Sequence, residues 1–223
     1  MSRFFKACFF LISILAIAIL VYIAVPWYRF NAIIIHHSAS NNDNYASIKE
    51  FHAKSRGWRD AAYHLILSNG STYVPTGYLE ATGRYHYLSF SPATKDPECN
   101  LQALHLCIVG NYNQRELPQK LRAPLAYALR SLQKKYHIRD SRILFHRDCN
   151  GTACPGRFIS KEKIKDWVDL QADKCLPKIK NQQLEVIDAT LMSFNPPWRS
   201  PLALEIVRFS RSCVRLIPSW SGS

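Results

Sequence analysis

Two short apolar runs that end in histidine place the strongest constraint on how this chain folds. One is residues 32–35, followed by His36 and His37, and the other is residues 143–145, followed by His146. Both runs are too short for a helix, and their apolar residues suit a buried strand. Each histidine is therefore expected at the end of a buried strand, which is a good place for a ligand.

The segment from His146 to Gly156 is a loop by composition, because it contains the turn dipeptide Asn-Gly and ends in Pro-Gly. A His-Cys pair in one loop is weak support for a metal site when taken alone. His146 and Cys154 can nevertheless bind one Zn²⁺ ion, since zinc takes nitrogen and sulfur ligands. With His36 or His37 as the third ligand, the fourth position stays open, as in catalytic zinc sites.

The N-terminal segment carries no charged residue from Ala7 to Val25. At about 1.5 Å per residue, a helix of this length approaches the hydrocarbon thickness of a bilayer. Arg3 and Lys6 precede the run and a single Arg29 follows it, so the positive-inside rule places the N-terminus in the cytoplasm. We expect a retained single-pass transmembrane helix. A cleaved signal peptide is the alternative, although the run exceeds the usual apolar core of such peptides.

The composition indicates a globular protein with one sizeable core, with 48% hydrophobic and 20% charged residues. The net charge of +13 suits an anionic partner such as nucleic acid, a lipid surface or an acidic cell-envelope polymer. No nucleic-acid motif is recognisable, so no nucleic-acid partner is expected. Some of the seven cysteines could pair in an oxidising compartment, in a connectivity that the sequence does not define, and Cys107 is expected as a buried thiol.

The remaining patterns alternate between strands and helices. Helices are expected over residues 45–56, over 118–136 and after Ser160, with Pro124 kinking the second helix or shifting its start. Residues 61–67 and 71–74 are expected to form a hairpin around Asn69-Gly70, with a long loop over 76–100 and a strand over 101–109.

These elements predict an α/β fold with a central mixed β-sheet flanked by helices. Residues 1–29 would form the membrane anchor with a short cytoplasmic end, and residues 30–176 would form the main domain. Residues 177–223 would form a basic C-terminal extension that the sequence does not assign to a structure.

Four groups of residues resemble, in order, the motifs of one enzyme family. They are Ile33-Ile34-Ile35-His36-His37-Ser38-Ala39; Gly57-Trp58 followed by Ala62-Tyr63-His64-Leu65-Ile66; Leu106-Cys107-Ile108-Val109-Gly110-Asn111; and His146-Arg147-Asp148 with Thr152-Ala153-Cys154-Pro155-Gly156. The pattern resembles the zinc-dependent N-acetylmuramoyl-L-alanine amidases, a family that includes peptidoglycan recognition proteins and amidase-type phage lysozymes. The resemblance covers about residues 33 to 167 and implies the mixed sheet of that amidase fold.

The resemblance implies that His36, His146 and Cys154 bind zinc and that His37 does not. It also implies that Tyr63 lies beside the metal-bound water and that Thr152 lies near the developing oxyanion. Zinc would lower the pKa of its water toward ~7 and polarise the scissile carbonyl. The two hydroxyls would donate hydrogen bonds where negative charge develops. Tyr63 could instead be a core aromatic residue, and Thr152 could merely shape the loop.

Other candidate residues follow less directly. His64 and His86 are expected to bind substrate, although residues 83–97 depart from the family's usual Gly-x-His-rich pattern. Glu80 is a candidate general base, and Asp148 is expected to shape the loop or to orient a ligand.

The expected function is zinc-dependent hydrolysis of the amide bond between N-acetylmuramic acid and L-alanine, in peptidoglycan or in soluble muropeptides. The resemblance and the N-terminal segment together place this activity on the periplasmic side of a bacterial inner membrane. A non-catalytic peptidoglycan-binding envelope module is the alternative. Cys154 favours an enzyme, because family members that only recognise peptidoglycan tend to lack this ligand.

Overall fold

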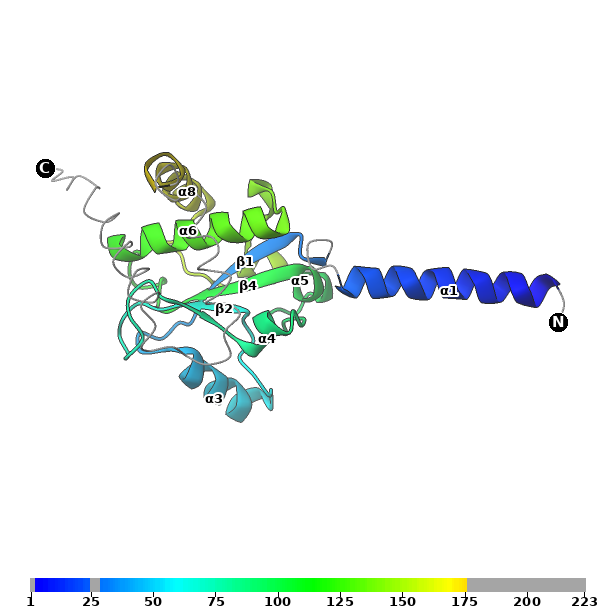
Figure 1. Cartoon of the computed structure of the whole chain (residues 1–223). Coiled ribbons are helices and arrows are strands. Elements are labelled where there is room, and N and C mark those ends of the chain that lie inside the picture. The colour runs from blue at the N-terminus through cyan, green and yellow to red at the C-terminus, as the bar shows by residue number, and fades with distance from the viewer. Residues whose placement is uncertain (1–2, 25–28, 176–223) are drawn as a thin grey trace, which may run out of the picture.

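The protein has a five-stranded sheet at its centre, with strand order β3-β2-β4-β1-β5 (Figure 1). The computed structural model describes residues 3–24 and 29–175. The strands are β1 (Ala32–His37), β2 (Leu65–Leu67), β3 (Leu79–Ala81), β4 (Ala103–Ile108) and β5 (Ile143–Phe145). β1 runs parallel to β4 and β5, and β2 runs parallel to β4, whereas β3 is antiparallel to β2. The predicted mixed sheet is confirmed.

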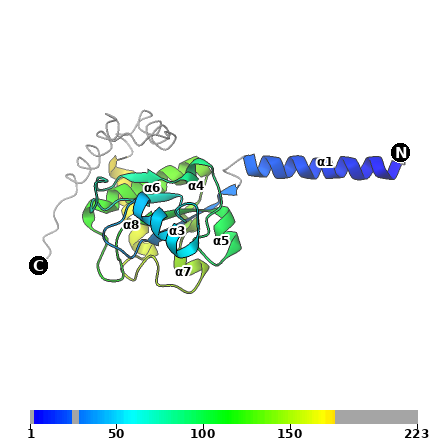
Figure 2. The same ribbon diagram turned by 90° about the horizontal axis from the view of Figure 1, so that it is seen from below.

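Helices cover both faces of this sheet. Figure 1 shows α6 and α8 over one face and α3 over the other, and Figure 2 shows α3 in front of the sheet when the molecule is seen from below. The helices are α1 (Arg3–Ala24), α3 (Tyr45–Arg56), α4 (Gly83–His86), α5 (Pro97–Gln102), α6 (Gln119–Tyr136), α7 (His146–Cys149) and α8 (Lys161–Cys175), with a 3₁₀ turn at Asp140–Arg142.

The larger part of the core lies between the sheet and the α6/α8 layer. Every residue of β1, β2 and β4 is buried. The predicted apolar face of α6 is confirmed, because its leucines are at most 2% exposed: Leu121, Leu125, Leu129 and Leu132. Burial of each such side chain contributes about 1.5–3 kcal/mol. The helix begins at Gln119 and continues through Pro124, so the proline does not shift its start.

The predicted hairpin was wrong in its second strand. β2 pairs with β3 instead of residues 71–74, and a wide loop joins the two strands. Ser68 closes this loop, because its hydroxyl donates to the Val74 carbonyl and its backbone exchanges hydrogen bonds with Gly77 and Tyr78. The Asn69-Gly70 signal indicated a real turn but not the register of the strand that follows.

The predicted long loop over residues 76–100 was also wrong, because it contains β3, α4 and most of α5. Side-chain caps start both short helices. The Thr82 hydroxyl accepts from the Arg84 backbone, and the Asp96 carboxylate accepts from the backbones of Glu98 and Cys99. Such short helices have no apolar periodicity to indicate them.

Within the segment predicted as a membrane anchor, residues 1–29, the structure has the helix α1, which ends at Ala24. Within residues 3–24 and 29–175, no helix meets the combined length and apolarity of a membrane span. The predicted C-terminal extension, residues 177–223, lies outside the described residues.

A disulfide connects Cys99, in α5, with Cys149, the last residue of α7. The two cysteines are 50 residues apart in the sequence. The cross-link therefore ties the region before β4 to the short helix that follows β5. Cys107 is a free thiol and fully buried, as predicted.

Removing the disulfide with Cys99→Ser and Cys149→Ser together is expected to destabilise the fold by about 4 kcal/mol, the loss of chain-entropy restriction for a loop of this size. Urea denaturation of the oxidised protein measures the change. Reduction of the wild-type protein is the matched control and should lower the free energy of unfolding by a similar amount. The stability of the double variant should not change with reductant. A double variant as stable as the oxidised wild type would contradict this expectation.

Candidate metal centre

The sheet brings the first two predicted ligands together. β1 lies between β4 and β5 and is parallel to both, so the carboxyl ends of all three strands meet at one edge. Ile35 pairs with Phe145, and the next residues along the two strands are His36 and His146. Their ring centroids are 4.6 Å apart. The two histidines thus converge because of strand register.

Cys154 reaches the same place from the loop after α7. Its Sγ lies 3.8 Å from His36 Nδ1, and one ligand atom from each of His36, His146 and Cys154 lies within 4.8 Å of the other two. The structure therefore brings all three predicted ligands together.

Arg147 holds the loop that carries Cys154. Its backbone N–H donates to the Cys154 carbonyl at 3.1 Å, and its guanidinium donates to the carbonyls of Gly156 and Ile159. Gly156 has φ of +111°, and a Cβ there would lie 2.3 Å from the Tyr112 carbonyl carbon. A side chain at position 156 is therefore excluded, and the loop is fixed on both sides of the cysteine.

His36 and His37 point to opposite faces of the sheet because side chains alternate along a strand. The His37 ring accepts a hydrogen bond at Nδ1 from the backbone of Tyr112, at 3.1 Å. Its backbone N–H donates to Cys154 Sγ at 3.3 Å. Of the two histidines that the strand pattern left open, His36 is therefore the one that lies in the cluster, while the backbone of His37 donates to the thiol.

The donor set fits zinc. Two imidazoles and one thiol are ligands that zinc prefers, and in a tetrahedral site they would be separated by about 3.3–3.7 Å. The three ligand atoms lie within 4.8 Å of one another, so they would need to move only slightly closer to reach this separation. Burial lowers the pKa of His36 well below its usual value and also lowers that of His146, so both rings are neutral, as ligation requires. Burial raises the pKa of Cys154 to about 11, which the His37 N–H and Arg147 oppose, and a bound cation would favour the thiolate.

Tyr63 lies beside this cluster, two residues before β2 begins. Its ring centroid is 5.0 Å from that of His36. Burial, with smaller contributions from the thiols of Cys107 and Cys154, raises the pKa of Tyr63 well above its usual value. The hydroxyl therefore keeps its proton at neutral pH and can act as a hydrogen-bond donor.

Thr152 shapes the loop and keeps a proton to donate. Its hydroxyl oxygen accepts a hydrogen bond from the backbone of Cys154 at 3.3 Å, two residues ahead. Asp148 stabilises the preceding turn, because its carboxylate accepts from the Phe145 backbone at 2.9 Å and pairs with Lys161. This is the loop-shaping role expected for Asp148.

The remaining predicted residues have different surroundings. His64 is fully buried and both of its ring nitrogens bond to backbone groups, so its predicted contact with substrate is corrected to a structural role. Glu80 is engaged at the start of α3, where its carboxylate accepts from the Tyr45 backbone at 3.0 Å, and burial raises its pKa. His86 is the last residue of α4 and half-buried, and its role stays a prediction.

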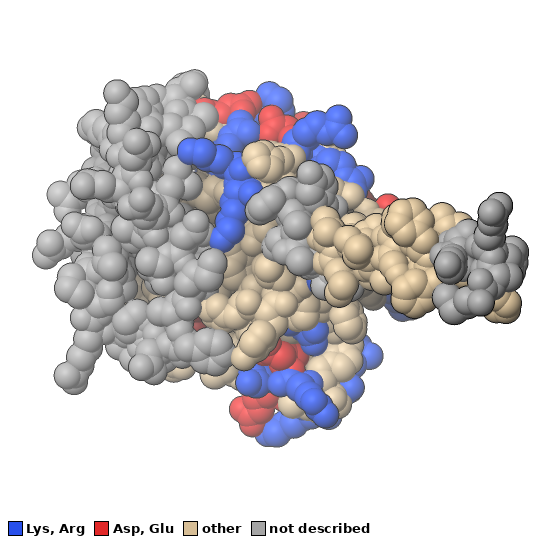
Figure 3. Space-filling model, turned by 45° about the vertical axis from the view of Figure 1, so that its right-hand side comes forward, with Lys and Arg blue, Asp and Glu red and all other residues tan. Residues whose placement is uncertain are grey.

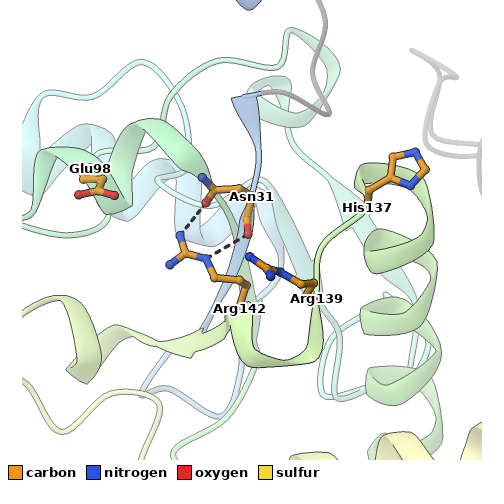
Figure 4. Close-up of a pocket in the computed structure, with 5 residues that line it drawn as sticks. All are labelled: Asn31, Glu98, His137, Arg139 and Arg142. Atoms are coloured by element: carbon orange, nitrogen blue, oxygen red, sulfur yellow. Dashed lines mark hydrogen bonds between the residues drawn. The ribbon is translucent and has the colours of Figure 1, made fainter.

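A separate pocket, with a cavity volume of 370 Å³, lies at the amino end of β1, the opposite end of that strand from the ligand cluster. Figure 4 shows the residues that line it, with Arg142 bonded to Asn31. The lining residues are Asn31, Glu98, His137, Arg139 and Arg142. None of these residues belongs to the ligand cluster.

Fold and cluster together define an α/β protein with a potential metal centre at the carboxyl ends of parallel strands. The sequence profile of the N-acetylmuramoyl-L-alanine amidases matches residues 26–157, more than half of the chain. The chain belongs to this family.

Relatives agree with this assignment. The N-acetylmuramoyl-L-alanine amidase LysC from Clostridium intestinale URNW superposes with a TM-score of 0.54 at 27% identity, over 65% of this chain and 88% of that chain. Bumblebee PGRP-SA shares the fold, with a TM-score of 0.50 and 17% identity over 65% of this chain and 83% of that one. Peptidoglycan-recognition protein LE of Drosophila melanogaster is 29% identical over 120 residues, which are 52% of this chain and 31% of the relative. The match thus spans about a third of that curated relative.

Replacing the sulfur ligand tests the cluster directly. Cys154→Ser substitutes a hydroxyl for a soft anionic donor, so zinc should be lost or become labile while the domain stays folded. Zinc content after dialysis, together with circular dichroism, measures both. Cys8→Ser makes the same chemical change in α1 and should leave zinc content unaltered. Full zinc retention by folded Cys154→Ser would exclude the thiol as a ligand.

Proposed function

We propose that this protein is a zinc-dependent amidase that hydrolyses the bond between N-acetylmuramic acid and L-alanine in peptidoglycan or muropeptides. The observation that carries the proposal is the convergence of His36, His146 and Cys154, with Tyr63 beside them, in a chain of the amidase family. The names of the similar solved structures, LysC among them, give the reaction.

The two imidazoles and the thiol would hold the zinc ion and leave a fourth position for water or substrate. Zinc bound there would supply Lewis-acid activation of the water and of the amide carbonyl. Hydrolysis adds water across the amide, so the lactyl carbonyl becomes a carboxylate and the L-alanine nitrogen becomes a free amine. The products define the assay.

Tyr63 and Thr152 would act on the charge that develops at the carbonyl oxygen. Tyr63 keeps its proton, because burial raises its pKa, and so it donates rather than accepts. The Thr152 hydroxyl accepts from the loop backbone and has its own proton left for the substrate. Each well-aimed donor of this kind is worth about 3 kcal/mol in the transition state.

Purified protein is expected to release new L-alanine amino termini from peptidoglycan and to lose this activity with a chelator. Amino-terminal labelling of insoluble sacculi and of soluble muropeptides, assayed side by side, identifies the preferred substrate. Intact peptidoglycan and muropeptides in the presence of bound zinc would refute the amidase proposal. Binding to sacculi without new amino termini would instead support a non-catalytic peptidoglycan-binding module.

Tyr63→Phe removes one hydroxyl and is expected to lower kcat by about 10²–10³-fold, because a transition-state donor is lost. Zinc content should not change, since Tyr63 is not in the ligand set. Tyr73→Phe makes the same change at a side chain that is 63% exposed and should retain full activity. If Tyr63→Phe were as active as Tyr73→Phe, the hydroxyl would have no catalytic role.

We further propose that α1 holds the protein at a bacterial inner membrane, with the amidase domain on the periplasmic side. Many of its apolar side chains are about half exposed or more: Phe5, Phe9, Phe10, Leu11, Ile12, Ile14, Leu15, Ile17, Ile19, Leu20 and Val21. Figure 3 shows this helix as an almost uncharged projection beside a surface that carries many basic groups. Apolar area of this extent favours a lipid environment over water.

Vesicle flotation tests the membrane proposal. The full chain should float with vesicles in high salt, because apolar contact is not screened as ionic contact is. A variant with Phe9→Ser, Leu11→Ser and Leu15→Ser should float poorly. Recovery of the wild-type chain in the soluble fraction at every salt concentration would contradict the proposal.

A further inference from the structure

A row of three buried histidines leads away from the ligand cluster across the sheet. His36, on β1, lies beside His105, on β4, and His64 lies next to His105. Their rings are stacked, with centroids 5.1 Å and 5.7 Å apart, and none of the three is more than 1% exposed. Of the three, only His36 is in the ligand cluster.

The hydrogen bonds of His105 have a defined direction. Its Nε2 lies 3.1 Å from the carbonyl oxygen of Cys99, which can only accept, so Nε2 must carry a proton. An imidazole with a single proton that donates from Nε2 leaves Nδ1 bare. A bare Nδ1 is an acceptor.

The tautomer of His105 determines that of the ligand His36. His36 Nε2 lies 2.9 Å from His105 Nδ1, and with an acceptor opposite it must carry the proton. Neutral His36 then has its lone pair on Nδ1, the atom that lies 3.8 Å from Cys154 Sγ. The nitrogen that faces the cluster is therefore the one that can coordinate a metal.

His64 fixes His105 in turn. The His64 Nδ1 accepts from the His105 backbone N–H at 3.0 Å, and the His64 Nε2 donates to the Ser89 carbonyl at 2.8 Å. The two histidines outside the cluster thus each donate from Nε2 to a backbone carbonyl, His105 to that of Cys99 and His64 to that of Ser89. The disulfide to Cys149 restrains Cys99.

We propose that His105 is a positioning residue that fixes the tautomer and ring orientation of His36, so that His36 Nδ1 is preset to bind zinc. The proposal rests on the function proposed above, since it assumes that His36 is a zinc ligand. Groups that accept the second N–H of a metal-binding histidine commonly contribute 10–100-fold to metal affinity.

Two substitutions separate positioning from packing. His105→Asn places an oxygen near the former Nδ1 and keeps an acceptor for His36, whereas His105→Gln places its polar group near the former Nε2 and loses that acceptor. Zinc affinity of the full chain in detergent, measured by chelator competition, should fall 10–100-fold in His105→Gln. It should recover largely in His105→Asn.

His52→Gln is the matched control. His52 is also a buried histidine whose Nδ1 accepts from a backbone N–H, that of Ala62, but it is not hydrogen-bonded to a ligand. Its substitution should reduce thermal stability and leave zinc affinity unchanged. Equal zinc affinity in folded His105→Gln and wild type, or equal losses in all three variants, would overturn the proposal.

The tautomers can also be read without substitution, which keeps the test decisive if a variant does not fold. In the zinc-free wild-type protein, ¹⁵N spectra of the histidine rings should show His36 and His105 both protonated at Nε2. Protonation of His36 at Nδ1 would overturn the proposal. Wild-type protein that binds no zinc would defeat the proposed amidase, whereas normal zinc binding with the wrong tautomer would defeat only the role of His105.

Discussion

Parallel pairing of β1 with both of its neighbours is the constraint on which the candidate site depends. Because β1 lies between β4 and β5 and all three run in the same direction, residues at their carboxyl ends meet without any contribution from long flexible loops. His36 and His146 are separated by more than a hundred residues in sequence. In space they lie opposite each other, because each directly follows a residue of the pair Ile35 and Phe145. A shift of one residue in β1 would turn His37 toward the cluster and His36 away from it.

The third ligand needs a different kind of support, since no strand carries Cys154. The loop is instead fixed by polar contacts to main-chain groups, mostly from Arg147, and by a glycine that permits close approach to Tyr112. The His37 N–H donates to the sulfur. Adjacent residues of β1 thus serve the centre in two ways, His36 through its side chain and His37 through its backbone.

Much of this arrangement could be predicted from the sequence, because short apolar runs indicate buried strands and the family motifs select His36, His146 and Cys154. The pairing of β2 with β3 could not, because Leu79–Ala81 is too short to show an alternating pattern. His105 was also missed. A single histidine in an apolar strand is usually a core residue, and only the structure shows that its ring contacts a ligand.

Residues 76–100, which the sequence predicted to be a long loop, supply the backbone carbonyls that hold the histidines behind the candidate metal centre. A buried imidazole is costly unless both nitrogens have partners, and the chain of histidines beneath the ligand cluster ends at the carbonyls of Cys99 and Ser89. Cys99 belongs to α5, and Ser89 lies three residues after the end of α4. Both helices are short and lie between β3 and β4 in the sequence. The disulfide from Cys99 ends at Cys149, in the helix that begins with His146. One covalent bond therefore restrains both sides of the cluster: the hydrogen-bonded row behind His36 and the helix that carries His146.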